Sequence, residues 1–363
     1  MDVNEFDYDL PASLIAQHPP TERDASRMLL LHRANGAYED LTFREFPDLL
    51  RGDETIVLNN VRVLPARLFG HRAGVRAQQI GKGNPARHEF PQAQIEVLLV
   101  RQLGPNQWEA LVRPGRKIGV GEKIVFGEGE LEAHVESRGE FGLRALRFSA
   151  KGNFADAVAR LGHIPLPPYI KREDEPEDRE RYQTVFSRQG SAVAAPTAGL
   201  HFTEETLRRV RERGVQIVEI TLDVGLGTFE PVRTERLEQH KIRAESYEIS
   251  ESAAAAINEA RSKSTPILAI GTTVVRALED AAEKCGAGSG EIRAGRAEAN
   301  IFLYPGKPFP MVNHLLTNFH LPKSTLLALV CAFAEKENVL RAYRHAVESR
   351  YRFYSYGDCM LIR

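Results

Sequence analysis

Polar segments that lead into apolar, helix-like runs contain the residues of this chain best suited to chemistry. One of them reads LTNFHLPKSTLLALVCAF, residues 316–333. Its His320 is a candidate general acid or base, because an imidazole titrates near neutral pH. Pro322 disfavours helix in the residue before it, so Ser324 or Thr325 can cap a helix that begins at once. A helix N-terminus attracts anions, and the segment predicts either an anion-binding loop or an ordinary capped helix start.

Two more segments at predicted strand ends have a similar character. AAPTAGLHFT, residues 194–203, contains Gly199, which permits close backbone approach, and His201, a second candidate base. TLDVGLGTFEPV, residues 221–232, is a strand that runs into a Gly-x-Gly turn. This turn lacks the third glycine and the following helix of a dinucleotide fingerprint, so NAD binding is not expected. For each histidine, the alternative is a hydrogen-bonded structural role.

A fourth segment, AIGTTVVRAL at residues 269–278, opens a predicted helix with Thr272 and Thr273 and places Arg276 one turn in. Open α/β sheets bind their ligands at the carboxyl ends of their strands. The four segments are therefore predicted to meet there. H-E-x-x-H spacing, a G-x-S-x-G elbow and a P-loop are all missing from the sequence, so no metal site is expected.

The composition is that of an ordinary globular protein. The chain has 363 residues, 42% of them apolar and 27% charged, which suggests about two domains. Cys285, Cys331 and Cys359 are far apart in sequence, which argues against disulfides and thiolate zinc sites and favours a reducing cytoplasm. The acidic start MDVNEFDYDL is unlike a signal peptide, and the apolar stretch 326–334 is too short to span a membrane.

Charge and aromatic patterns give two open readings. The net charge is −1, yet residues 62–117 hold ten Lys or Arg against three Asp or Glu. This local excess predicts either a track for phosphates or a solvated β surface. The cluster YRFYSYGD, residues 351–358, is suited to stacking on a nucleic-acid base, or to forming one face of a strand packed on the core.

The periodicity predicts a discontinuous α/β domain with a mostly parallel sheet and an inserted antiparallel β-barrel. The α/β domain is expected at residues 1–62 and 151–363, and the barrel at residues 63–150. Within the barrel, residues 70–94 are expected to form a polar insert. Strands of the α/β domain are predicted at 28–31, 55–58, 215–222, 266–270, 300–303 and 359–362. Helices are predicted at 155–161, 204–212, 252–261, 273–285 and 339–349.

Several long motifs, in order along nearly the whole chain, resemble one family. They are FDYDLPASLIAQHP, ARLFG, GHIPLPPYI, YQTVF, APTAGLHFT, VGLGTFEPV, IGTTVVRALE, TNFHLPKSTLLALV and YRFYSYGD. The chain resembles the S-adenosylmethionine:tRNA ribosyltransferase-isomerases of queuosine biosynthesis. The resemblance implies transfer and isomerisation of the ribosyl group of S-adenosylmethionine onto the 7-aminomethyl-7-deazaguanine at the tRNA wobble position. The products are epoxyqueuosine, adenine and methionine.

The resemblance also implies the partners and the setting. They are S-adenosylmethionine as co-substrate with no other cofactor, a tRNA that carries the deazaguanine, and a cytoplasmic enzyme with no membrane or obligate protein partner. Nothing demands more than a monomer. Two alternatives remain open: a nucleoside or sugar transferase for small molecules that never contacts RNA, and a non-catalytic RNA-binding module.

Candidate roles follow from what this reaction needs. We expect His201 to be the base at the carbon next to the sulfonium, and His320 to be a second acid or base or an adenine contact. The S-adenosylmethionine contacts are expected to be Thr197, Gly199, Gly225, Gly227, Thr272, Thr273, Arg276, Lys323 and Ser324. The carboxylates available to the deazaguanine are Asp223, Glu245 and Asp358. The tRNA phosphate contacts are expected to be Arg62, Arg67, Arg113, Arg116 and Lys117.

The chain departs from the family pattern in three places. It has Asn60-Val61-Arg62 where Asp-Thr-Arg is usual, Asp223 where His is usual, and Ile242-Arg243 where Met-His is usual. A catalytic role of a histidine at either of the last two places does not transfer to this chain. The stretch 70–94 is also longer than usual.

Overall fold

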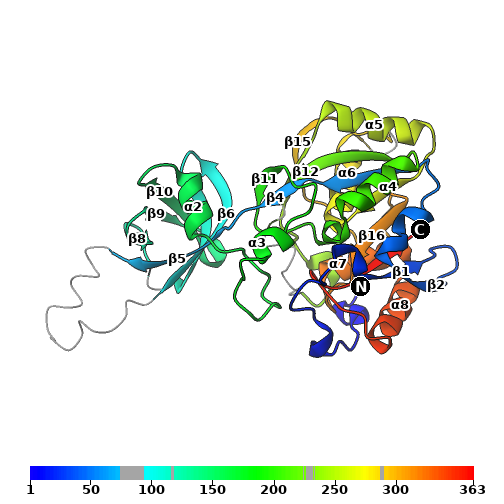
Figure 1. Ribbon diagram of the computed structural model, residues 1–363, viewed down its shortest axis with the longest axis horizontal. Helices are drawn as coiled ribbons and strands as arrows, with labels where there is room; N and C mark the ends of the chain where they lie inside the picture. The colour runs from blue at the N-terminus through cyan, green and yellow to red at the C-terminus, as the bar shows by residue number, and fades with distance from the viewer. Residues whose placement is uncertain (74–93, 116–117, 224, 226–231, 233, 287–289) are drawn as a thin grey trace.

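The computed structural model describes residues 1–73, 94–115, 118–223, 225, 232, 234–286 and 290–363. Figure 1 shows two units, a larger α/β domain and a smaller β-barrel, joined by a narrow connection. The predicted fold class is confirmed.

A nine-stranded sheet forms the centre of the α/β domain within the described residues. Its four middle strands, β12, β3, β14 and β16, run parallel. Towards both edges the pairing is mainly antiparallel, so the sheet is mixed rather than mostly parallel. In spatial order the strands are β15 (Gly295–Ala299), β13 (Glu245–Ile249), β12 (Gln216–Leu222), β3 (Thr55–Asn59), β14 (Ile267–Ile270), β16 (His314–Asn318), β17 (Cys359–Ile362), β1 (Arg27–Leu31) and β2 (Tyr38–Thr42).

Alternating residues of these strands are buried on opposite faces, and helices cover both (Figure 1). Leu29 and Leu31 contribute to the core beneath four helices, whereas Met28 and Leu30 contribute to the core on the other face. The first face is covered by α5 (Glu251–Ser262), α6 (Thr272–Lys284), α7 (Thr325–Ala334) and α8 (Lys336–Glu348). The second is covered by the 3₁₀ helices η4 (Phe43–Leu49) and η8 (Thr197–His201) and by α4 (Glu204–Glu212).

The barrel closes on itself through six antiparallel strands in the described part of the chain. Period-two burial, as in Trp108, Ala110 and Val112, fills its interior. Helix α2 (Phe154–Leu161) packs on it through Ala157 and Val158. In spatial order the strands are β10 (Leu143–Ala150), β7 (Gln107–Arg113), β6 (Ile95–Gly104), β5 (Arg67–Arg72), β8 (Lys123–Phe126) and β9 (Leu131–Arg138).

The connection between the units is a parallel pair, β4 (Val61–Val63) and β11 (Gln189–Ala192). The motif GHIPLPPYI packs beside it, with Ile164 and Leu166 in a small core that also contains Tyr182. The remaining short helices are α3 (Asp178–Arg181), η1 (Val3–Phe6), η2 (Ala12–Leu14), η3 (Arg23–Ala25), η7 (Glu140–Gly142) and η10 (Leu237–Gln239).

One predicted strand is wrong. Residues 300–303 are not a strand, because β15 ends at Ala299 and the chain then turns. The backbone N–H of Asn300 donates to the Asp280 carboxylate, and Leu303 is buried in the core from this loop. The apolar residues at 300–303 are therefore explained by a loop that is partly buried in the core, not by a strand.

Candidate active site

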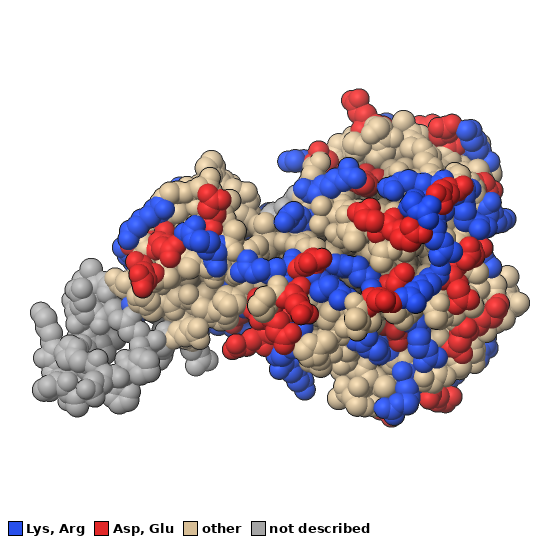
Figure 2. Space-filling model, in the orientation of Figure 1, with Lys and Arg blue, Asp and Glu red and all other residues tan. Residues whose placement is uncertain are grey.

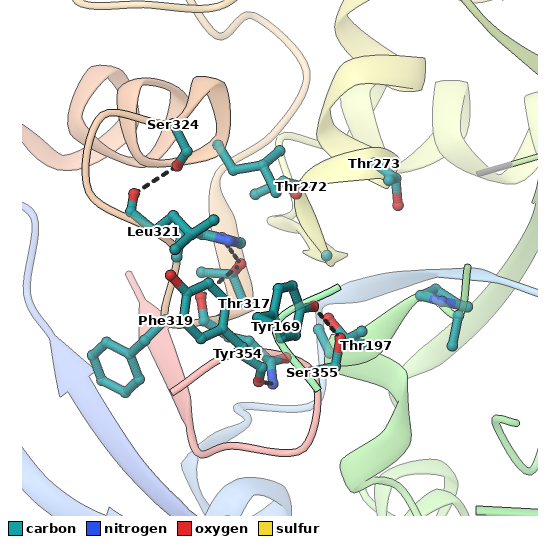
Figure 3. A pocket seen from close by; sticks show the side chains of 17 residues that line it. Tyr169, Thr197, Thr272, Thr273, Thr317, Phe319, Leu321, Ser324, Tyr354 and Ser355 are labelled. Atoms are coloured by element: carbon teal, nitrogen blue, oxygen red, sulfur yellow. Dashed lines mark hydrogen bonds between the residues drawn. The ribbon is translucent and has the colours of Figure 1, made fainter. Parts of the chain in front are cut away.

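A cavity opens at the carboxyl ends of β14 and β16, where an α/β sheet is expected to bind its ligand (Figure 3). Its empty space, including the part open to solvent, is about 660 Å³. The lining comes from residues 195–198, 271–273 and 317–321 and from Tyr169, Ser324, Leu326, Tyr354 and Ser355. Three of the four predicted segments therefore meet here.

Two helix N-termini lie at this cavity. Gly271, at φ 95°, turns the chain from β14 into α6, and Thr272 and Thr273 follow it in the lining. Ser324 caps α7: its hydroxyl accepts from the N–H of Leu327 at 3.1 Å and donates to the carbonyl of Leu321 at 2.7 Å. Orphan N–H groups and the helix dipoles favour a negative ligand group at this place.

His320 is the histidine that lines the cavity. Its Nε2 lies 2.8 Å from the hydroxyl of Thr317, and its backbone N–H donates to the hydroxyl of Tyr343 at 3.0 Å. Burial lowers the pKa of His320 to about 3, so the ring is neutral at pH 7. The site thus offers a neutral imidazole already in a hydrogen bond.

The N-terminal motif FDYDL holds the loop that carries His320. The hydroxyl of Tyr8 donates to the carbonyl of His320, and the N–H of Lys323 donates to the carbonyl of Phe6 at 2.9 Å. The ammonium of Lys323 pairs with Asp7 at 2.9 Å. No local pattern in the sequence predicts the contact between these two distant motifs.

The polar wall opposite α7 includes Tyr354 and Ser355 of the cluster YRFYSYGD, which the sequence analysis related to base stacking or to core packing. Tyr169 and Tyr354 stack with ring centroids 4.4 Å apart, and the hydroxyl of Tyr169 lies 2.6 Å from that of Ser355 (Figure 3). The amide nitrogen of Asn318 donates to the carbonyl of Tyr354 at 2.9 Å. Among the described residues, no partner is found for the amide oxygen of Asn318 or the hydroxyl of Tyr354. The signal for Asn318 in the sequence was its place in the polar part of the segment 316–333.

His201 lies elsewhere. It ends η8, is 3% exposed and sits 5.4 Å from the ring of Phe43. It lines a second, much smaller cavity, here called the rear cavity, which includes Ser26 and shares Ser355 with the first. Burial lowers the pKa of His201 to about 4, and interaction with the Asn318 side chain opposes the shift. His201 is thus separate from the lining of the main cavity.

Comparison with known families decides the kinship of this chain. A family model described as queuosine biosynthesis protein matches residues 3–362. The chain belongs to the queuosine biosynthesis protein family. This membership confirms the resemblance drawn from the motifs.

Similar proteins carry a more specific name. Relatives from Solibacter usitatus, Symbiobacterium thermophilum and Moorella thermoacetica are 54%, 48% and 47% identical, and each match covers 100% of both chains. All three are named S-adenosylmethionine:tRNA ribosyltransferase-isomerase. A crystal structure titled S-adenosylmethionine tRNA ribosyltransferase from Thermotoga maritima is 34% identical and covers 99% of this chain and 100% of its own, with a TM-score of 0.52. These names agree with the predicted tRNA-modifying enzyme and do not favour the small-molecule alternative.

The remaining predicted S-adenosylmethionine contacts lie outside the main cavity or outside the described residues. A Cβ on Gly199 would lie 2.7 Å from Phe186 and 2.8 Å from Thr184, so this glycine serves close packing. Arg276 is buried, pairs with Glu245 and donates to backbone carbonyls such as that of Ala299 at 3.1 Å. Gly225 lines another hollow, and Gly227 is outside the described residues.

That hollow lies between the barrel and the edge of the sheet. Its empty space, counted in the same way, is about 2540 Å³. The barrel hairpin 100–105 forms one wall, and residues 243–248 and 296–298 form the other. Asp223, at the end of β12, belongs to the lining. Because β16, β14, β3 and β12 are parallel neighbours, both openings follow the same edge of the sheet.

The three predicted carboxylates differ in exposure. Asp223 is exposed in the hollow, whereas Glu245 lines it but is buried against Arg276. Asp358 is buried and accepts from the N–H groups of Arg27 at 2.9 Å and Arg352 at 2.8 Å. Burial raises the pKa of Asp358. Its contacts join the loop 352–358 to β1.

The predicted tRNA contacts also differ in exposure and pairing. Arg62 and Arg113 are exposed, whereas Arg67 pairs with Glu96 at 3.2 Å and donates to the carbonyl of Leu166 at 3.1 Å. Arg116 and Lys117 lie outside the described residues. Figure 2 shows basic and acidic side chains interspersed over the face in view.

Neither a metal-binding cluster nor a membrane-spanning helix is found in the described part of the chain. Clusters of three or more His, Cys, Asp or Glu with metal-binding geometry were not found there. In the same residues, helices with the length and apolar character needed to cross a bilayer are lacking.

Proposed function

We propose that this protein transfers and isomerises the ribosyl group of S-adenosylmethionine onto the 7-aminomethyl-7-deazaguanine of tRNA. The observation that carries the proposal is the family match over residues 3–362, together with a cavity at the sheet edge that hydroxyl, amide and imidazole groups line. The proposal extends to a cytoplasmic setting, where tRNA is modified, and to a reaction with no cofactor beyond S-adenosylmethionine.

In this proposal S-adenosylmethionine occupies the main cavity. Its carboxylate lies at the N-terminus of α6, near Thr272 and Thr273, because the orphan N–H groups there favour an anion. Thr197 and Ser324 supply neutral hydroxyls in the same lining. The aromatic pair Tyr169 and Tyr354 offers apolar surface for the rest of the molecule.

The modified base enters from the hollow beside the barrel. Its aminomethyl group is a cation and its Watson–Crick edge carries N–H donors, so a carboxylate suits both. Asp223 is the exposed carboxylate of the three candidates. Arg62 and Arg113, exposed on β4 and β7, are proposed to contact tRNA phosphates.

The reaction begins with proton removal from the ribose carbon next to the sulfonium, whose positive charge makes that carbon acidic. His320 is the proposed acid–base group, since it lines the cavity and its ring is neutral. The hydroxyl of Thr317, 2.8 Å from Nε2, orients the ring. Position within reach of the proton is the first requirement of general base catalysis, and His320 is proposed on that ground.

Release of adenine from S-adenosylmethionine tests the proposal. We expect release with tRNA that carries the deazaguanine and none with the same tRNA carrying guanine. Adenine release without any tRNA would instead support a small-molecule transferase. Binding of tRNA with no adenine release under any condition would support a non-catalytic RNA-binding module.

A further inference from the structure

Two buried atoms of complementary character lie without partners near the main cavity. Nε2 of His201 and the amide oxygen of Asn318 each lack a hydrogen bond to any described residue. The two residues are 3% and 2% exposed, so water outside the protein does not satisfy these atoms. Leaving a buried polar atom unpaired is unfavourable, so a partner is expected.

His201 is placed to act as a hydrogen-bond donor and not as a base, because it is outside the lining of the main cavity. It lies against Phe43 and lines the small rear cavity, not the main one. With a pKa near 4 the ring is neutral at pH 7 and carries one N–H. Helix η8, which ends at His201, packs against strand β16, which ends at Asn318, so the two residues lie on neighbouring elements. An interaction with the Asn318 side chain also raises the pKa of His201, against the effect of burial.

Asn318, by contrast, lines the main cavity. One of its two amide N–H bonds is already used, because Nδ2 donates to the carbonyl of Tyr354 at 2.9 Å. If its oxygen is also occupied, the group left for a ligand is the second N–H. The side chain then selects an acceptor atom and rejects a donor.

We propose that His201 is a positioning residue whose Nε2–H donates to the amide oxygen of Asn318 and fixes that amide as a hydrogen-bond donor to S-adenosylmethionine. This inference rests on the proposed function, since it names the ligand of the main cavity. His201 itself contacts no substrate.

A water molecule is the competing partner of His201. The rear cavity has room of about 10 Å³ and includes Ser26, whose hydroxyl also lacks a described partner. One water needs about this much space. If that water alone satisfied Nε2, Asn318 would be independent of His201, and changes at His201 would leave S-adenosylmethionine affinity unaltered.

Two variants at His201 separate the roles. His201→Gln keeps a neutral side chain with an N–H donor, and we expect kcat and the KM for S-adenosylmethionine to stay within about threefold of wild type. His201→Leu removes the donor, and we expect that KM to rise about tenfold with little change in kcat, as for one lost hydrogen bond. Both variants should keep the pH profile of wild type. A drop of a hundredfold or more in kcat for His201→Gln is the signature of a lost base and would overturn the proposal.

The matched control is His314→Gln. His314 is another histidine whose pKa burial lowers to about 4 and whose Nδ1 has no described partner, but it lies at the other end of the sheet, at the start of β16. We expect no change in KM. An equal rise in KM for His314→Gln would show that any change of a buried histidine disturbs the site, and would refute the specific link to Asn318.

Asn318→Asp tests the ligand side. A carboxylate has no N–H for the cavity, so calorimetry should show S-adenosylmethionine affinity falling at least tenfold. Adenosine and methionine as competitive inhibitors then identify which half of the co-substrate meets Asn318. Unchanged affinity for all three would exclude the donor role. Adenine release by wild type is the reference: an inactive wild type refutes the function, whereas an active wild type with unaffected variants refutes only this inference.

Discussion

At the scale of single residues, burial decides what each titratable group can do. His320 and His201 are both neutral in the folded protein, yet one lines the main cavity and the other lines the rear cavity. Arg276 and Glu245 are 4% and 3% exposed and are paired, so neither charge is available without breaking the other's contact.

The pH dependence of catalysis should reflect the lowered pKa of His320. A base works unprotonated, and a pKa of about 3 keeps this ring unprotonated at all pH values above about 4. We therefore expect no inflection in kcat/KM near pH 6.5 that belongs to His320. The measurement is kcat/KM from pH 5 to 8 for wild type and His320→Gln, with circular dichroism confirming the fold at each pH. An inflection near 6.5 that vanishes in the variant would contradict the assignment.

Replacement of Arg276 should mainly destabilise the folded protein, with a smaller direct effect on S-adenosylmethionine binding. Arg276→Met leaves the buried Glu245 carboxylate unpaired, which we expect to lower the free energy of unfolding by about 3–5 kcal/mol. The double variant Arg276→Met with Glu245→Gln should recover part of that loss. Urea denaturation measures both. If Arg276→Met kept wild-type stability and lost S-adenosylmethionine affinity in calorimetry, Arg276 would be a ligand contact instead.

At the scale of elements, the cavity depends on how strands turn into helices. β14 passes into α6 through Gly271, whose φ of 95° is a region that side chains with a Cβ adopt at a cost. β16 passes into α7 through the loop 319–323, which the N-terminal motif holds. The positions of both helix N-termini therefore follow from backbone turns rather than from the helices themselves.

Gly271→Ala should disturb the site through the backbone. A Cβ there would have room, with its nearest neighbour at 3.7 Å, so the cost is the φ angle, about 1 kcal/mol or more. We expect a lower melting temperature and at least threefold weaker S-adenosylmethionine binding. Gly152→Ala is the control, because Gly152 also has positive φ, at 108°, and lies far from the cavity with open space around it. Equal binding losses in both variants would show that the turn at Gly271 has no special role.

Sequence patterns predicted the elements whose signals are local. Helix α4 lies at 204–212 as predicted, because Thr203 caps its start and Gly214 ends it. Strand β16 was not predicted: HLLTN is short and polar at both ends, and its partners β14 and β17 come from distant parts of the chain. Pairing between strands that are far apart in the sequence leaves no periodic pattern within either strand.

The candidate site was predictable by segment and only in part by residue: His320, Thr272 and Ser324 line the cavity as expected, whereas His201 and Arg276 do not. The stretch TNFHLPKST does line the cavity, yet its asparagine and first threonine, Asn318 and Thr317, face it as His320 does. The position of His201 is set by the 3₁₀ turn of η8, which no spacing rule predicts. The partner of Arg276 lies on β13, an element that was also missed.

At the scale of the whole molecule, the barrel and the α/β domain face each other across the larger hollow. Strand β4, with Arg62 exposed, lies between them. The two openings share one sheet edge, so a base and a co-substrate bound in them would approach along it.

Binding of tRNA should weaken as salt rises, because contacts to phosphates release counterions. Arg62→Gln should lower affinity and reduce the slope of log affinity against log salt by about 1. The control is Arg208→Gln on α4, which is exposed and pairs with Glu205 and Glu212 away from the hollow. Filter binding at several salt concentrations gives both slopes. A slope unchanged in Arg62→Gln would remove Arg62 from the interface.

The free energy of unfolding should fall in acid. His201, His314 and His320 have folded pKa values of about 4, 4 and 3, below the unfolded 6.5, so the unfolded chain binds more protons in between. Each histidine lowers stability by up to ~1.4 kcal/mol per pH unit as pH falls below 6.5. Glu279 acts in the opposite direction, since burial raises its pKa to about 7. Thermal unfolding from pH 7 to 4.5 should show the net loss, reduced in His314→Gln; a flat profile would contradict it.

The parallel pair β4 and β11 has a consequence for how the chain folds. Strands β3 and β12 pair although Thr55 and Gln216 are 161 residues apart, and closing so long a loop is slow and entropically costly. Once the barrel has formed, the pairing of Val61 with Gln189 brings the two arms together, and the remaining loop is short. We therefore expect a barrel that forms first to speed assembly of the sheet that it interrupts. A change that slows barrel formation should then also delay assembly of the sheet edge that holds both openings.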